Sequence, residues 1–256
     1  MMDCTRWCSG ILWLAATATV ADAQDCVLPG PFQRQFQNNV TATLSAANAE
    51  GPCALSVALK AGGGPLAAGF LHYRRSSPTT SVRYGFRIDS SALANFNLTN
   101  LLRNVQLFSA SSPVVVGADG SLPWSHLLLI QLAGGNPSPK LVLTAANALG
   151  VGGVASQLSI PLTQALNTLR VEINVGVGSA GFVRYWLNTS FNDPPTGTFG
   201  NGGLDNAAWI GVIAAEVGVS SPSISFRNDY SGSAIVLDQI ESSDDLLLWS
   251  DFETLQ

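Results

Sequence analysis

Two segments of this chain carry aromatic, arginine and asparagine side chains of the kind that bind sugars. Aromatic rings stack on the apolar face of a sugar ring, while arginine and asparagine form hydrogen bonds with its hydroxyls. Within 181–188, Arg184 and Trp186 point to the same side, because side chains alternate along a strand. The alternative is that the large rings belong to a hydrophobic core. The residues that we expect to contact a ligand are Arg184, Trp186, Asn188 and Trp209.

A second candidate site, catalytic in kind, lies around one glutamate. Glu172, which lies near Arg170 and Tyr185 in the predicted sheet, is the only glutamate around which we would place an atypical acid–base site. A solvated glutamate on the outer side of a strand is the alternative. His72 and His126 cannot be placed together from the sequence, and no serine lies in a Gly-x-Ser-x-Gly elbow.

The elements that position these residues follow a leader. Arg6 precedes an apolar run from Ile11 to Val20, and Ala21-Asp22-Ala23 has small residues where a signal peptidase cleaves. The run is about half the length of a membrane span. We therefore expect a signal peptide at residues 1–23, a single domain over 24–256, and a secreted or periplasmic protein without a membrane span.

Two cysteines remain after removal of this leader, Cys26 and Cys53. An oxidising compartment favours a disulfide between them. A metal or redox role is the alternative, but the pair lacks Cys-x-x-Cys spacing.

Composition favours turn-rich β-structure. Charged residues make up 11% of the chain, whereas glycine and proline number 25 and 13. The net charge of −5 argues against a nucleic-acid partner. Short stretches with period-two patterning, bounded by Gly, Pro, Asn or Ser, predict strands at 55–59, 82–88, 105–108, 126–132, 140–144, 169–175, 181–188, 208–219 and 234–241. Only 90–102 and 162–169 suggest short helices.

The order of these segments resembles the concanavalin A-like, laminin-G-like jelly-roll family of secreted lectin and glucanase domains. The residues that carry the resemblance are Gly51-Pro52-Cys53-Ala54-Leu55-Ser56-Val57, 81–88, 169–173, 181–188 and 233–241. The resemblance covers roughly residues 26 to 245 and implies an all-β antiparallel sandwich with at most short accessory helices. The chain departs from the family at Asn188-Thr189-Ser190, where a hairpin glycine is expected.

The resemblance also implies a calcium ion held by a carboxylate of the last long strand, and Asp238 is the matching position. The alternative for the acidic residues between 238 and 245 is a solvated turn. Glycosidases of this sandwich class place their carboxylates as Glu-x-Asp-x-x-Glu, and this motif is absent.

These observations lead to one main hypothesis and two alternatives. We expect a secreted, non-catalytic β-sandwich that binds carbohydrate or another extracellular polymer. The first alternative is a glycoside hydrolase or polysaccharide lyase on the same fold, with its site around Glu172, Arg170 and Tyr185. The second is a structural or adhesive surface domain. Because the paired carboxylates of the glycosidases are missing, we favour the two non-catalytic hypotheses over an enzyme.

Overall fold

The computed structural model describes residues 32, 34–45, 54–59, 67–89, 104–113, 126–135, 138–147, 156–199, 203–229 and 234–243. Regular structure in these segments is almost entirely β-strand. The exceptions are the α-helix α1 (Ile224–Asp229) and the 3-10 helices η2 (Gly178–Ala180) and η3 (Ala207–Trp209). The prediction of an all-β protein with short accessory helices is therefore confirmed.

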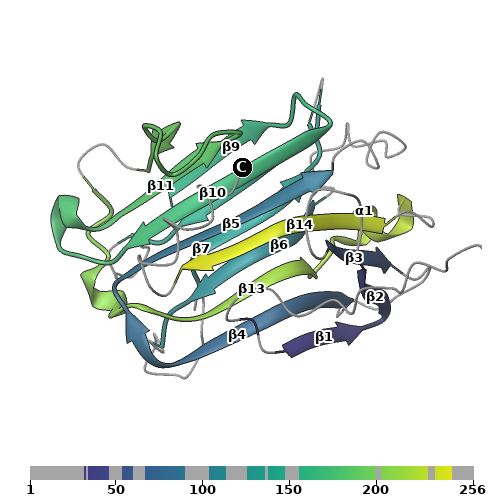
Figure 1. The fold of residues 1–256 in the computed structure, drawn as a ribbon, viewed down its shortest axis with the longest axis horizontal. Coiled ribbons are helices and arrows are strands. Elements are labelled where there is room, and N and C mark those ends of the chain that lie inside the picture. Colours follow the sequence, from purple (N-terminus) through teal and green to yellow (C-terminus); the bar gives the residue numbers. More distant parts are fainter. Residues whose placement is uncertain are drawn as a thin grey trace, which may run out of the picture.

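Fourteen strands form two seven-stranded antiparallel sheets (Figure 1). Sheet A has, in spatial order, β1 (Arg34–Asn38), β4 (Ala68–Thr79), β13 (Val212–Ser220), β6 (Asn104–Ser111), β7 (His126–Ala133), β8 (Lys140–Ala145) and β9 (Ser156–Pro161). Sheet B has β12 (Gly197–Thr198), β11 (Phe182–Leu187), β10 (Leu166–Asn174), β5 (Ser81–Asp89), β14 (Ala234–Ser243), β3 (Ala54–Leu59) and β2 (Val40–Ser45).

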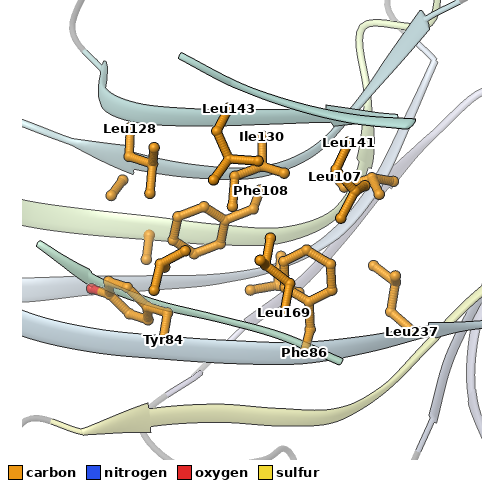
Figure 2. Close-up of a cluster of buried hydrophobic side chains, with 14 of the residues drawn as sticks. Tyr84, Phe86, Leu107, Phe108, Leu128, Ile130, Leu141, Leu143, Leu169 and Leu237 are labelled. Carbon is orange, nitrogen blue, oxygen red and sulfur yellow. The ribbon is translucent and has the colours of Figure 1, made fainter. Parts of the chain in front are cut away.

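The sheets pack face to face because one side of each central strand is apolar. On β5, Tyr84 and Phe86 are buried, and on β6 Phe108 packs against both rings. Figure 2 shows side chains from the two sheets pointing toward one another in this core. Alternation then places the intervening polar residues on the outer face of each sheet, which is the face directed away from the core.

The predicted helix at 162–169 is wrong, because β10 begins at Leu166. β10 pairs with β5 on one side and with β11 on the other, so its backbone groups are satisfied by neighbouring strands. The other predicted helix, at 90–102, lies outside the described residues. Strands β1, β2, β4, β9 and β12 were not expected from the sequence pattern.

The predicted leader at residues 1–23 and both Cys26 and Cys53 lie outside the described residues, so cleavage and the disulfide stay predictions. Within the part of the chain that is described, no helix has the length and apolar character needed to cross a membrane.

Candidate functional site

The sheet B residues predicted to bind a ligand lie on β11 and in the turn after it. Arg184 is paired in register with Glu172 of β10, and Trp186 with Arg170, so all four side chains share the outer face of sheet B. The strand alternation expected for Arg184 and Trp186 is therefore present.

Trp186, however, is not an exposed platform. Its side chain is covered by the loop that follows β11, and the residue is only 3% exposed. Its Nε1 donates to the carbonyl of Asp193 at 2.8 Å, and Phe191 packs edge-on with ring centroids 4.8 Å apart. The expectation that its ring faces are open to a sugar is wrong, because this loop folds back over the sheet.

Trp209 and Asn188 also have structural surroundings. Trp209 is buried in the core cluster, and its Nε1 donates to the carbonyl of Asn147 at 2.8 Å. Asn188 has a φ of 58°, and its side-chain oxygen accepts from the backbone N–H of Thr168. Asparagine tolerates this left-handed conformation better than most residues, so it occupies the turn at which a glycine was expected.

The carboxylate of Glu172 is held between two guanidinium groups. Arg83 Nη2 lies 3.0 Å from Oε1, and Arg184 Nη1 lies 3.5 Å from Oε2. Arg170 turns instead to Glu241, with two contacts of 3.4 Å. Tyr185 packs on the core side of the same sheet. The alternative site around Glu172, Arg170 and Tyr185 is therefore not assembled.

Asp238, the predicted calcium ligand, is engaged by an arginine. Arg87 Nε donates to one carboxylate oxygen at 2.8 Å, and Arg87 Nη2 donates to the other at 2.6 Å. The described residues contain no group of three or more His, Cys, Asp or Glu side chains that could hold a metal. A cation at Asp238 would have to displace the guanidinium, so this geometry does not fit the calcium site implied by the resemblance.

A different cluster lies on the outer face of sheet A. Its members are His72 on β4, Glu216 on β13, Ser109 and Ser111 on β6, and His126 on β7. These strands are consecutive in the sheet, so residues far apart in the sequence become neighbours. We refer to these five residues as the His–Glu cluster.

Glu216 stands at the centre of this cluster. It is the register partner of His72 on one side and of Ser109 on the other. His72 Nδ1 lies 3.4 Å from Oε1, and the Ser109 hydroxyl donates to Oε2 at 3.4 Å. One carboxylate thus joins three strands, while the His72 and Glu216 side chains remain 31% and 30% exposed.

The second histidine joins the cluster from β7. His126 Nδ1 lies 3.0 Å from the Ser111 hydroxyl. Burial lowers the pKa of His126 from its ordinary value of 6.5, and the negative charge of Glu216 opposes this shift. The ring is therefore neutral near pH 7 and able to accept a proton.

Strand alternation also brings an arginine to this face. Leu71 and Tyr73 of β4 point toward the core, so His72 and Arg74 point outward. Arg74 is exposed and lies in register with Ala214, which in turn is in register with Ser111. Because Ala214 has only a methyl group, the face between Arg74 and Ser111 carries little side-chain bulk.

Sequence reasoning missed this cluster because β4 was not predicted as a strand. The signal was present in the first half of the strand, where Phe70, His72 and Arg74 alternate with Leu71 and Tyr73. The sequence could not show which carboxylate lies beside His72, because β4 pairs with β13 and the two strands are far apart in the chain.

Several solved structures have the same fold as this chain, at very low sequence identity. An endo-β-1,4-glucuronan lyase from the fungus Trichoderma reesei matches with a TM-score of 0.58 and 12% identity, covering 84% of this chain and 91% of the lyase. The marine PL-14 alginate lyase from Aplysia kurodai matches with a TM-score of 0.51 and 11% identity, covering 79% of this chain and 86% of the lyase. Another alginate lyase gives 0.52 and 13%, covering 80% and 86%.

No family model matches this sequence, and no curated protein matches it. At identities of 11% to 13%, the structural likeness concerns the fold alone. It confirms the expected all-β jelly-roll sandwich fold.

Proposed function

We propose that this protein binds an acidic polysaccharide across the outer face of sheet A and cleaves it by β-elimination. The observation that carries this proposal is that His72, Glu216, His126 and the exposed Arg74 share one face of sheet A, with His72 in contact with Glu216 and His126 in contact with Ser111. The lyases with the same fold support the choice of reaction class, and the predicted leader fits an extracellular polymer as substrate.

Elimination at a uronic acid needs three groups. A cation must balance the substrate carboxylate, a base must remove the proton from the adjacent carbon, and an acid must protonate the departing glycosidic oxygen. The electron pair released from the C–H bond becomes the new double bond, so no water is consumed.

The His–Glu cluster offers each of these groups. In the proposed arrangement Arg74 pairs with the substrate carboxylate, since a guanidinium matches a carboxylate with two hydrogen bonds. His126, neutral because burial lowers its pKa, takes up the proton through Nε2 while Nδ1–H donates to Ser111. His72, whose Nδ1 lies 3.4 Å from Glu216, is the group that passes a proton to the leaving oxygen.

Glu216 is a positioning residue in this scheme. Its carboxylate orients His72 and accepts a hydrogen bond from Ser109, so each of its two oxygens already has a partner in the protein without substrate. After each turnover the proton gained by His126 passes to solvent and His72 regains one, which restores the starting state.

The test is an incubation of the full chain with glucuronan, with alginate and with a neutral β-glucan. We expect unsaturated uronate products, followed by ultraviolet absorbance, from one of the acidic polymers and none from the neutral one. His126→Ala and Arg74→Ala should each lower the rate at least about a hundredfold. Melting curves of both variants establish that they are folded.

Arg184→Ala is the matched control, because Arg184 lies on the outer face of the opposite sheet. Its rate should stay within about twofold of the unmodified protein, since it touches no member of the cluster. Loss of activity in Arg184→Ala with full activity in Arg74→Ala would move the site to sheet B. Retention of a polymer without any products would contradict cleavage and leave the non-catalytic binding expected from the sequence.

A further inference from the structure

Two phenylalanines lie on the same outer face as the His–Glu cluster. Phe36 of β1 and Phe70 of β4 are register partners, and their rings stack with centroids 5.1 Å apart and planes inclined by 24°. Phe36 is 38% exposed, although most large apolar side chains among the described residues are buried. Part of this stacked aromatic surface is open to solvent and available to a ligand.

This aromatic pair stands next to the site. Phe70 lies two residues before His72 on β4, and alternation puts both side chains on the outer face. Two residues of a strand span about 7 Å, so the two side chains lie close together along β4. The Phe36–Phe70 pair therefore lies within reach of an extended polymer that passes over His72 and Glu216 along β4.

The position on β13 that lies beside Phe70 has no side chain. Its register partner on β13 is Gly218, which has a φ of 150°. A Cβ at Gly218 would lie 2.4 Å from Phe70 Cα, so no larger residue fits there without moving the strands. The glycine thus lets β13 approach β4 closely and leaves the side of Phe70 next to β13 without an outward-pointing side chain.

We propose that Phe36 and Phe70 form an aromatic subsite that stacks against a pyranose ring of the polysaccharide, one sugar away from the His–Glu cluster. The C–H groups on the flat face of a pyranose match an aromatic surface, and such contacts add affinity without taking part in the reaction. This inference rests on the proposed function of the cluster. The aromatic pair is directly followed on the same face by the polar side chains of His72 and Glu216. A surface that combines aromatic rings with polar groups favours a sugar chain over a protein as the occupant.

The experiment compares Phe36→Ala, Phe36→Leu and Phe36→Trp in the full chain. With the polymer that the unmodified protein cleaves, KM should rise about fivefold for the alanine and leucine variants, with kcat within about twofold. Phe36→Trp should keep the unmodified KM, because it preserves an aromatic face. Retention of the three variants in gels containing that polymer should follow the same order.

Val177→Ala is the matched control. Val177 is an exposed apolar residue, 75% exposed, in the loop between β10 of sheet B and η2, so it is not on the outer face of sheet A. It should leave KM and retention unchanged. If Phe36→Leu behaves as the unmodified protein, the pair is apolar packing or a protein contact, and the subsite is overturned. If the unmodified protein neither cleaves nor retains any polymer, the proposed function itself fails, whereas cleavage with an unchanged KM in Phe36→Ala contradicts only the subsite.

Discussion

His72 and Glu216 are register partners on adjacent strands, with His72 Nδ1 3.4 Å from a carboxylate oxygen. The same carboxylate accepts from Ser109 and acts through its charge on His126. A single glutamate therefore connects four strands of sheet A electrostatically or by hydrogen bonds. This relationship places three titratable side chains, His72, His126 and Glu216, close together on the outer face of sheet A.

Replacing Glu216 should lower the pKa of His126 further. The negative charge of Glu216 raises this pKa, while burial lowers it, so Glu216→Gln leaves only the lowering effect. A pH titration of the imidazole resonances by NMR measures the shift, and a His72→Asn variant assigns the two histidine signals. Glu241→Gln, on sheet B, is the control and should leave the titration of His126 unchanged. An unaltered His126 pKa in Glu216→Gln would contradict the proximity of these groups.

His126 should also make the protein less stable in mild acid. Its pKa is lowered in the folded state, so the unfolded chain takes up the proton first as the pH falls below 6.5. The free energy of unfolding therefore decreases from about pH 7 downward, until the folded state is protonated as well. Urea denaturation at about pH 7.5 and about pH 5.5 measures this change. His126→Gln should show a smaller decrease, and an equal decrease in both proteins would exclude His126 as its source.

Trp186→Ala should destabilise the fold by about 3 to 5 kcal/mol, as large-to-small substitutions of buried aromatic residues do. The variant removes the packing against Phe191 and the hydrogen bond to Asp193. Trp186→Phe keeps an aromatic ring and should lose less. Denaturant unfolding of both variants checks the order, and a polymer-binding defect in a fully stable Trp186→Ala would restore the surface role that the sequence suggested.

Breaking the Arg87–Asp238 pair should cost about 2 to 4 kcal/mol, because both side chains are mostly buried and the removed partner leaves a charge uncompensated. Asp238→Asn is the simplest variant. In a double-mutant cycle with Arg87→Met, the second substitution should add little to the first. Fully additive losses would mean that the two side chains do not interact.

Calcium should leave the melting temperature unchanged. Both oxygens of Asp238 already accept from Arg87, and the described residues provide no cluster of metal ligands. Melting curves in excess calcium and in chelator are the measurement, since a ligand that binds only the folded state would raise the midpoint. A calcium-dependent rise that Asp238→Asn abolishes would support the site implied by the resemblance.

The sequence pattern predicted those strands whose two faces differ along their whole length. On β5, Val82, Tyr84, Phe86 and Ile88 are apolar and alternate with two arginines, and the structure buries all four. The pattern failed for β4, which is apolar and partly buried in its first half and polar and mostly exposed from Arg74 onward. It also failed at 162–169, where pairing with strands on both sides decides the conformation of Leu166 and the residues after it.

The sequence by itself determined the all-β class, the sandwich architecture and the side of β5 that faces the core, because the alternation of apolar and polar residues is a local property of the chain. Only the tertiary structure decided which polar residues meet. His72, Ser109, His126 and Glu216 lie on four strands brought together by long-range pairing. It likewise decided that Trp186 is covered, since the loop carrying Phe191 folds back over it. Register and loop docking depend on contacts between distant segments, and local spacing does not encode them.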